Sequence, residues 1–540
     1  MNRRKFMQSA AAAITAPAGM KAQVPDSQLQ NFIHTAESLK PRLSETIVNP
    51  VSLVWPRPDP STFLKWRMDI LGPATVLRER VWRAGDTFIL DFGRHLTGHL
   101  VFSVSGVGAY IDAPVRLKLT FGEVPPDVAI PLETYSGTLS RAWLPDEIIN
   151  VDFLPQHVRM PRRYAFRYVK IEVIDTAPPF SARFDEIHAV ALTSAAAPPP
   201  ALETRVPELL RDIDRVSLNT LRDCMQTVFE DGPRRDRRLW IGDLRLQALT
   251  NYVSFRNYEL VKRCLYLFAG LPREDGLVAA CVYEKPTPLC GRQYIMDYAA
   301  LYGSVVLDYV RATGSNDVAR ELWRVVKRQM DILGQFVNDS GLFVDPGGWW
   351  IFIDWRDELD RTAAMHGVLL FAYRQALDLA RLAGRQNDAA SYPERIRRMT
   401  AAARESFYDK DRGVFVSGPH RQVSWATQAW MIHAGIATTA EGKTALERAT
   451  NMPDAIRPGT PYLYHYVTDA MLLCDMKKEA NDLVTSYWGG MVKAGADTFW
   501  EIYDPSNPTL SPYKSVLVNS YCHAWSCTPA YLIRSGKLLP

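Results

Sequence analysis

The sequence contains little of what marks several classes of protein. Its seven cysteines are an odd number without metal-ligand spacing, which excludes a disulfide framework and gives no zinc-binding pattern. We expect free, buried thiols, although Cys281 and Cys290 are close enough in sequence to pair within a loop. The formal net charge is only +4 and no basic stripe is present, so nucleic acid is not an expected partner. No apolar run is long enough to anchor the chain in a membrane.

What the sequence does contain is aromatic residues and ample apolar material. Hydrophobic residues make up 47% of the 540 residues, an ordinary value for a globular protein, and the length predicts two or three domains. The 14 tryptophans and 23 tyrosines suit carbohydrate binding, because aromatic faces stack on the apolar faces of sugar rings. Most of these side chains are nevertheless expected in the core.

The N-terminus carries the features of an export signal. Arg3 and Arg4 form a twin-arginine pattern, a short apolar stretch follows at 10–15, and the small residues of 16–18 offer a cleavage site. The apolar stretch is too short to span a bilayer. We therefore predict a cleaved twin-arginine signal peptide over residues 1–23 and a periplasmic or secreted bacterial protein. The alternative is a disordered tail that happens to hold two arginines.

Two regions with different residue patterns follow, which predicts a multidomain protein. Over residues 45–193, short runs of alternating polarity separated by glycine, proline and aspartate predict an antiparallel β-sandwich. A small, proline-rich linker covers 194–202. Over 203–540, helical periodicity predicts about eleven helices in pairs, among them single helices at 243–268 and 515–535. Without an internal repeat, these pairs favour a six-hairpin toroid over a solenoid.

Two segments contain carboxylates of the kind that cleave a glycosidic bond, a reaction that takes two carboxyl groups. Segment 230–243 holds four carboxylates and four arginines in a loop, where arginines can orient a carboxylate and bind sugar hydroxyls. Alternatively, they form an ion-pair network that braces two helices. In segment 495–505, aromatic residues frame Glu501, which is a candidate base or sugar-binding group. Alternatively, it is a surface carboxylate beside buried aromatics.

Two further segments are candidates for sugar binding. Segment 347–355 has adjacent glycines followed by three tryptophans and an aspartate, which suits a sugar platform or a buried aromatic corner. His523 lies beside Trp525 in segment 521–525, in a binding or a structural role. The candidate sugar contacts from all four segments are Asp231, Arg235, Arg238, Trp240, Asp243, Trp350, Asp354, Trp355, Trp500 and His523.

Together these segments resemble glycoside hydrolase family 78, the α-L-rhamnosidases, and the wider group of six-hairpin glycosidases. The family motif D-C-P-Q-R-D-E-R-L-G-W-T-G-D is similar to D-G-P-R-R-D-R-R-L-W-I-G-D at 231–243. The family's T-x-W-E and S-x-x-H segments resemble 498–501 and 520–523. In the preceding β-domain, the family's D-F-G-x-x-x-x-G and R-Y-V-x-V segments resemble 91–98 and 167–171. The similarity covers about residues 45 to 540, in the family's order.

The resemblance implies a β-sandwich followed by an (α/α)6 barrel, and an inverting, exo-acting hydrolase without a metal or organic cofactor. Its substrate would be a terminal rhamnose, or a similar deoxy sugar, on a glycoside or a pectin-like chain. In this family the glutamate of the T-x-W-E segment is the general base, which implies that Glu501 is the base here. The given sequence stops at Pro540, soon after the last predicted helix, where many family members continue into another β-domain, so we expect a short member of the family with a different substrate preference. The sequence leaves the oligomeric state open.

The general acid is where this sequence departs from the family. The family's acid is the glutamate of R-D-E-R, and counting forward from Asp231 puts Arg237 at that place. The loop is one residue shorter than in the family, however, so counting back from Asp243 puts Asp236 there. We assign Asp236 as the acid, with a shorter reach than glutamate.

Two other functions are compatible with the sequence. The arginine-rich loop would suit a carbohydrate enzyme of the same fold, a hydrolase or a lyase, that acts on an acidic, uronate-containing glycan. Loss of the usual glutamate at Arg237 would suit a catalytically silent sugar-binding protein. Activity on acidic oligosaccharides but not on simple rhamnosides distinguishes the first, and sugar affinity without turnover distinguishes the second.

Overall fold

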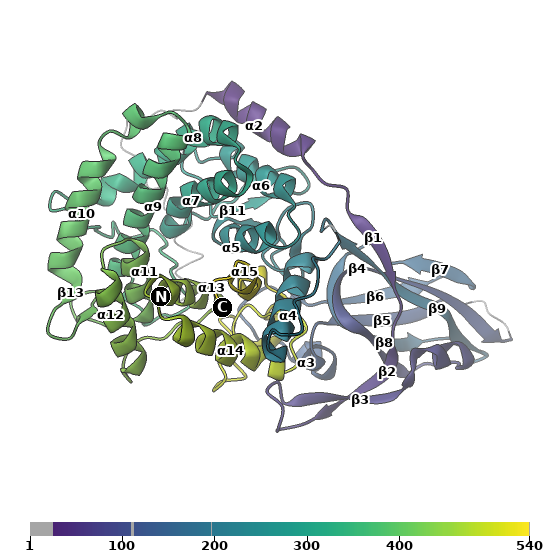
Figure 1. The fold of residues 1–540 in the computed structure, drawn as a ribbon. Helices are drawn as coiled ribbons and strands as arrows, with labels where there is room; N and C mark the ends of the chain where they lie inside the picture. The colour runs from purple at the N-terminus through teal and green to yellow at the C-terminus, as the bar shows by residue number, and fades with distance from the viewer. Residues whose placement is uncertain (1–24, 110–112, 196, 539–540) are drawn as a thin grey trace.

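The chain forms a β-domain and a helical domain that lie side by side, each around its own hydrophobic core (Figure 1). The computed structural model describes residues 25–109, 113–195 and 197–538, so the predicted signal peptide lies outside the described residues. Helix α2 (Asp26–Ser38) precedes the β-domain but packs on helix α6 of the helical domain.

The β-domain is a single antiparallel sheet joined through one long strand, β4, which pairs with β2, β7, β8 and β9. A bulge at Gly93, whose φ of 73° suits glycine, interrupts the pairing of β4 with β8. The sequence predicted an antiparallel β-sandwich, and the structure confirms an antiparallel β-rich domain before the helical one. Its strands are β1 (Ser44–Val48), β2 (Ser52–Pro58), β3 (Trp66–Pro73), β4 (Thr87–Gly108), β5 (Val115–Gly122), β6 (Asp146–Val151), β7 (Gln156–Arg159), β8 (Tyr164–Asp175) and β9 (Phe180–Thr193).

The helical domain contains the twelve helices α4 to α15 in its described residues, as six hairpins require. They are α4 (Glu208–Cys224), α5 (Ile241–Tyr252), α6 (Tyr258–Gly270), α7 (Met296–Thr313), α8 (Asn316–Leu333), α9 (Thr362–Leu382), α10 (Tyr392–Phe407), α11 (Trp425–His433), α12 (Thr439–Asn451), α13 (Pro461–Leu473), α14 (Lys477–Lys493) and α15 (Pro529–Arg534). Helices α14 and α15 pack against α4, which closes the ring (Figure 1). The predicted (α/α)6 toroid is confirmed.

Inner and outer helices of the toroid differ in how much of their surface is apolar. Helices α5, α7, α9, α11 and α13 pack against one another in sequence order and are buried on almost all sides. Helices α8, α10 and α12 bury one face only and expose charged residues on the other. The alternation of helices that are buried on almost all sides with amphipathic helices therefore separates an inner from an outer ring.

Two predicted helices differ from the structure. The helix predicted at 243–268 is two helices, α5 and α6, because the Asn257 side chain caps a new helix by accepting from Leu260 N. The helix predicted at 515–535 is helical only in α15 and in two short 3-10 turns. The preceding backbone, 515–528, also bonds to other loops: Ser520 O accepts from Glu501 N, His523 N donates to Phe499 O, and Ala524 N donates to Asp231 O. These loops carry the candidate site.

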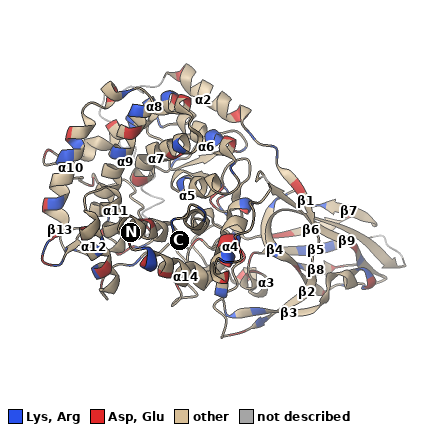
Figure 2. Ribbon diagram, in the orientation of Figure 1, with Lys and Arg blue, Asp and Glu red and all other residues tan. Residues whose placement is uncertain are grey.

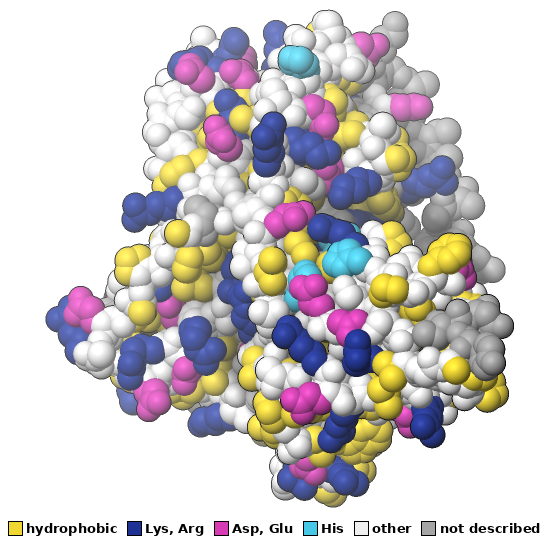
Figure 3. Space-filling view, turned by 90° about the vertical axis from the view of Figure 1, so that its right-hand side faces the viewer, with side chains coloured by type: hydrophobic (Ala, Val, Ile, Leu, Met, Phe, Trp, Pro, Cys, Tyr) yellow, Lys and Arg dark blue, Asp and Glu magenta, His cyan; other side chains and the backbone are white. Residues whose placement is uncertain are grey.

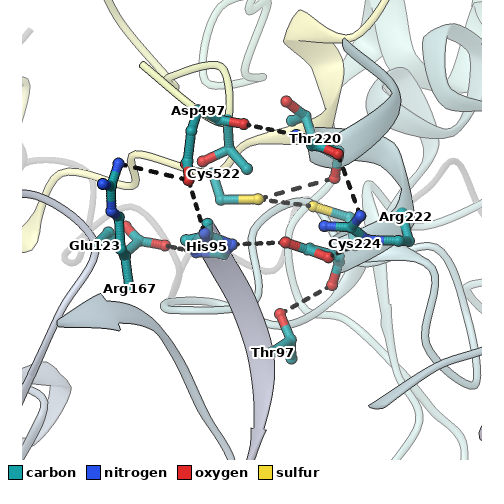
Figure 4. Close-up of polar contacts among 12 residues, drawn as sticks. His95, Thr97, Glu123, Arg167, Thr220, Arg222, Cys224, Asp497 and Cys522 are labelled. Atoms are coloured by element: carbon teal, nitrogen blue, oxygen red, sulfur yellow. Dashed lines mark hydrogen bonds and ion pairs between the residues drawn. The ribbon is translucent and has the colours of Figure 1, made fainter. Parts of the chain in front are cut away.

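A buried charge network joins the two domains around His95 of β4, which is 1% exposed (Figure 4). His95 Nδ1 lies 2.8 Å from Asp223 at the end of α4, and His95 Nε2 lies 3.1 Å from Glu123 of the β-domain. Burial by itself lowers the pKa of His95, but Cys522, Asp223 and Glu123 outweigh it and hold the pKa well above 6.5. The imidazolium therefore bridges carboxylates of both domains.

Cys224 and Cys522 lie next to this network, with their sulfur atoms 3.8 Å apart (Figure 4). All seven cysteines are free, as the sequence predicted. Cys522 therefore belongs to the charge network, because it is the first of the groups that raise the pKa of His95, and His95 in turn helps to lower the pKa of the Cys522 thiol.

The surface mixes charges of both signs. Lys and Arg alternate with Asp and Glu over the helices, and the face of the β-domain shows the same mixture (Figures 2 and 3). Among the described residues, no helix combines the length and the apolar character needed to cross a membrane.

Candidate active site

The segments that carry the two predicted catalytic carboxylates are joined through their backbones. Glu501 N donates to Ser520 O at 2.9 Å, and Ala524 N donates to Asp231 O at 2.8 Å. Segment 515–528 therefore lies between the two carboxylate loops and holds both. Loops 270 residues apart in sequence, at 231 and 501, thereby form one site.

The Glu501 side chain is 3% exposed, and both of its carboxylate oxygens accept hydrogen bonds. Arg235 Nη2 and the Tyr513 hydroxyl each donate to one of its carboxylate oxygens. Arg235 is itself fixed, since its Nε donates to Val518 O at 2.8 Å and its guanidinium lies 4.2 Å from the Tyr513 ring centre. Burial raises the pKa of Glu501 above its ordinary 4.5, although the charge of Arg235 and the hydrogen bond from Tyr513 act in the opposite direction.

Asp236 occupies a strained turn of the arginine-rich loop. Asp236 and Arg237 have φ values of 61° and 52°, two consecutive left-handed residues that are not glycine. Such strain persists only where the surroundings enforce it, and it is common at functional sites. The Asp236 side chain is partly exposed, and its Oδ1 lies 3.6 Å from Arg235 Nη1. Arg235 thus contacts both predicted catalytic carboxylates.

Asp231 and Asp243 complete a cluster of four carboxylates. Burial, reinforced by Asp236 and Asp243, raises the pKa of Asp231 well above 3.8. Burial, reinforced by Glu501 and Asp236, does the same for the pKa of Asp243. Arg238 N donates to Asp231 Oδ1 at 3.0 Å, which fixes that side chain. A ligand rich in hydroxyl groups could satisfy these buried carboxyl oxygens without adding charge.

His523 lies between the two buried aspartates. Its Nε2 is 4.0 Å from Asp231 Oδ2 and its Nδ1 is 3.7 Å from Asp243 Oδ1, and its ring centre is 4.3 Å from that of Trp525. Burial, followed by the charge of Arg235, lowers the pKa of His523 well below 6.5. The neutral imidazole can both donate and accept a hydrogen bond, which suits a sugar hydroxyl.

Buried polar atoms without a protein partner mark the same place. Within the described chain, four such atoms belong to predicted sugar contacts: Trp240 Nε1, Asp243 Oδ1, Trp355 Nε1 and His523 Nδ1. Buried polar groups are normally hydrogen-bonded, so a group of unpaired donors and acceptors in one region indicates a place for a polar ligand.

The tryptophan-rich segment 347–355 reaches this cluster through stacked rings. The ring centres of Trp350 and Trp355 are 6.1 Å apart, and Phe352 packs on Trp355 at 5.2 Å and on Trp525 at 6.0 Å. Trp525 in turn packs on His523. The structure therefore brings Trp350 and Trp355 together with the carboxylate cluster in one aromatic-lined region.

Trp500 takes a different place from the one we expected. Its ring stacks on Phe63 of the β-domain at 5.6 Å, on the side of the loop opposite to the Glu501 carboxylate. There it lines a cavity of about 620 Å³ between the domains, with Tyr168, Asp497 and Tyr521. Neighbouring residues of an extended loop point in opposite directions, so Glu501 faces the cluster while Trp500 packs against the β-domain.

The Asp354 carboxylate, too, is bound by other residues of the protein. Its carboxylate accepts from Thr460 Oγ1 at 2.6 Å and from Gly459 N at 2.5 Å, and it is 1% exposed. These bonds fix the start of helix α13 and occupy the carboxylate oxygens. The structure therefore gives Asp354 and Trp500 contacts with other parts of the protein and none with the Glu501 carboxylate, and their role as sugar contacts stays a prediction.

The sequence did not single out two residues that shape the site. Tyr513 donates to Glu501, but its surrounding loop contains no motif that would have indicated this. Arg234 lies within the arginine-rich segment and is 3% exposed. It donates to both oxygens of Asp127 in helix α3 (Pro125–Ala129) and to Leu517 O, and so anchors the loop to the β-domain.

No group of three or more histidine, cysteine, aspartate or glutamate side chains in the described residues is placed to hold a metal ion. The cluster of Asp231, Asp236, Asp243 and Glu501 instead has arginine and histidine as its neighbours.

Two protein-family models match the two domains of this chain. Residues 50–191 match the glycosyl hydrolase family 78 alpha-rhamnosidase N-terminal domain, and residues 203–535 match the bacterial alpha-L-rhamnosidase 6 hairpin glycosidase domain. The chain belongs to glycoside hydrolase family 78. It is therefore a glycosidase of the α-L-rhamnosidase family. A comparison with curated protein sequences gave no match.

Solved structures of this family share the fold. A rhamnosidase from Klebsiella oxytoca with rhamnose bound is 42% identical, with a TM-score of 0.91 over 94% of this chain and 98% of that one. The family 78 rhamnosidase of Bacillus sp. GL1 is 21% identical, with a TM-score of 0.73 over 87% of this chain and 49% of that one. An α-L-rhamnosidase from Streptomyces avermitilis complexed with L-rhamnose is 18% identical, with a TM-score of 0.65 over 92% and 44%. The last two similarities show the fold alone.

Proposed function

We propose that this family 78 glycosidase removes terminal α-L-rhamnose from a glycoside or pectin-like oligosaccharide, with inversion at the anomeric carbon. The observation that carries the proposal is that one guanidinium, that of Arg235, contacts both Glu501 and Asp236. An inverting glycosidase needs two carboxyl groups about 6.5–9.5 Å apart, so that water fits beside the sugar. Two carboxylates on one guanidinium, from separate loops and without direct contact, support such a spacing.

In the proposed mechanism, Asp236 donates a proton to the departing glycosidic oxygen while Glu501 takes a proton from the attacking water. Arg235 and Tyr513 orient the Glu501 carboxylate through their hydrogen bonds. The unpaired atoms of Trp240, Asp243, Trp355 and His523 would bind sugar hydroxyls.

The burial of the site supports exo action. Glu501, Asp231 and Asp243 are 3%, 4% and 2% exposed, so a single terminal sugar fits the cluster better than the middle of a chain. The rhamnose bound to the relative from Klebsiella oxytoca supports the choice of sugar. We also propose export through a twin-arginine signal, on the basis of Arg3 and Arg4 and the residues that follow them.

Substituting Asp236 tests the general acid. We expect Asp236→Asn to lower kcat/KM for a rhamnosyl disaccharide by about 10²–10⁴-fold, because an alkoxide leaves poorly without a proton. For 2,4-dinitrophenyl α-L-rhamnoside the loss should be much smaller, because that phenolate leaves without help. Steady-state kinetics of the purified protein with both substrates measures the difference.

Asp504→Asn is the matched control, since Asp504 lies in a loop near Glu501 and its carboxylate accepts hydrogen bonds, among the described residues, from Ser506 alone. An equal loss on both substrates would contradict the acid role of Asp236. Proton NMR of the first-formed rhamnose tests the stereochemistry: β-L-rhamnose is expected, and α-L-rhamnose would rule out inversion. If the unaltered protein cleaves no rhamnoside, the proposed function itself is wrong.

The pH dependence of activity should reflect the burial of Glu501. A general base acts only when ionised, and the pKa of this carboxyl is raised above 4.5. We therefore expect kcat/KM to fall on the acid side with a midpoint above pH 4.5. Aliquots held at each pH and assayed at neutral pH separate titration from denaturation. An acid midpoint at or below 4.5 would contradict the role of Glu501.

A further inference from the structure

A cavity between the two domains lies apart from the carboxylate cluster. Its volume is about 620 Å³, and neither Glu501 nor any of the three clustered aspartates lines it. The β2–β3 hairpin, β8 and the start of α3 form its wall on one side, and the end of α14 with loop 494–503 forms the other. Small-molecule sites in proteins typically have volumes of about 300–1,000 Å³. The cavity therefore has room for a ligand outside the proposed catalytic centre.

Aromatic rings from both domains line this cavity. Phe63, in the turn between β2 and β3, stacks on Trp500 with the ring centres 5.6 Å apart. The Tyr503 ring centre lies 5.0 Å from that of Phe63. Rings of this kind can stack on the apolar faces of a sugar. The six aromatic residues of the wall are Phe63, Trp66, Tyr168, Trp500, Tyr503 and Tyr521.

Polar groups without a protein partner belong to the same wall. Tyr168 is 5% exposed and Trp500 is 2% exposed, yet no hydrogen bond of the described residues involves the Tyr168 hydroxyl or the Trp500 indole nitrogen. Lys493, at the end of α14, is exposed to water and takes part in no ion pair of the described chain. An apolar ligand would leave the enclosed hydroxyl and indole groups unpaired, whereas a ligand with hydroxyl groups would bond to them.

The enclosed charges of the wall already have partners of opposite sign. Arg167 donates to both carboxylate oxygens of Asp91, at 2.9 and 3.0 Å, and its Nη1 lies 3.8 Å from Asp497 Oδ2 (Figure 4). Glu123 Oε1 lies 3.1 Å from His95 Nε2. Because these charges are compensated within the protein, the cavity favours an uncharged ligand. An uncharged ligand with several hydroxyl groups and apolar faces is a carbohydrate.

We propose that the cavity between the domains is a second carbohydrate-binding site. It holds a rhamnosyl unit by stacking on the aromatic wall and by hydrogen bonds from Tyr168, Trp500 and Lys493. The choice of a rhamnosyl unit rests on the proposed function, whereas the site itself rests on the cavity and its wall. Trp500, a predicted sugar contact, thereby contacts a sugar away from the Glu501 carboxylate.

The test counts the sugar molecules that each chain binds, with L-rhamnose as the probe. Equilibrium dialysis of the unaltered protein should give two molecules per chain. The double variant Tyr168→Phe/Lys493→Met removes two donors and keeps the shape of the wall. Its dissociation constant for one of the two sites should rise by about tenfold to hundredfold, because each lost hydrogen bond weakens binding by up to about tenfold. Its kcat/KM for an aryl α-L-rhamnoside should stay unchanged.

Three further variants assign the two sites. Tyr258→Phe/Lys443→Met is the matched control, because Tyr258 also makes no hydrogen bond through its hydroxyl in the described residues and Lys443 is an exposed lysine of α12. It should bind two molecules with unchanged affinity. His523→Ala should weaken the site at the carboxylate cluster and leave the other one intact. Trp500→Phe keeps an aromatic ring but lacks the indole nitrogen, so it should weaken the site between the domains.

The outcomes separate this inference from the proposed function. One L-rhamnose molecule per chain, weakened by His523→Ala alone, overturns the second site while the proposed function stands. Two molecules per chain with affinities that neither Tyr168→Phe/Lys493→Met nor Trp500→Phe changes also overturn it, because the second sugar then binds elsewhere. Binding that the double variant weakens, in a protein that hydrolyses no rhamnoside, supports the second site and shows that the proposed function has failed.

Discussion

Glu501→Gln should lower kcat for an aryl α-L-rhamnoside by about 10²–10⁴-fold, because the amide cannot accept the proton of the attacking water. The loss should be the same for activated and poor leaving groups, since water attack does not depend on protonation of the leaving oxygen. Glutamine keeps the shape of the side chain and can still accept from Tyr513, so KM should change little. Steady-state kinetics with both kinds of leaving group provides the measurement.

Glu447→Gln, on the exposed face of helix α12, is the matched control and should keep full activity. Circular dichroism of both variants should be unchanged. If Glu501→Gln keeps more than a tenth of the activity with a normal fold, another group must activate the water. A loss confined to poor leaving groups would assign Glu501 to the acid role instead.

Substituting His95 should cause the largest loss of stability. His95→Ala leaves Asp223 and Glu123 buried at the domain interface without the imidazolium that lies between them. Breaking a buried charge pair costs about 3–5 kcal/mol when the remaining partner is left uncompensated. Asp223 keeps its ion pair with Arg222, and Glu123 keeps its contact with Arg234, so we expect a loss near the lower end of that range. Urea unfolding of the variant and the unaltered protein, followed by fluorescence, measures the difference.

The pH dependence of this loss follows from the raised pKa of His95. A histidine whose folded pKa lies above 6.5 contributes its full stability below pH 6.5 and loses it as the pH rises through the folded value. The difference between His95→Ala and the unaltered protein should therefore shrink at alkaline pH. His157→Ala, an exposed histidine of β7, is the control. A His95→Ala loss no larger than that of His157→Ala would show that the network contributes little.

The sequence by itself predicted the architecture because its signals are local. Alternating residues such as those of β5 and helical periodicity such as that of α8 depend on neighbours within a few positions. The order of the motifs around Asp231, Glu501 and His523 was likewise visible in the chain and led to the correct family. Where local signals were weak, as between α5 and α6, the boundaries were wrong.

Only the tertiary structure decided which of the candidate residues face one another. Trp500 and Glu501 are adjacent in sequence, yet one packs on Phe63 of the β-domain and the other receives hydrogen bonds from Arg235 and Tyr513. Asp354 lies among tryptophans, as expected of a sugar-binding residue, but its carboxylate accepts a hydrogen bond from the backbone at the start of a helix. The direction of a side chain and its partners depend on long-range packing, and a sequence motif records only which residue types are present.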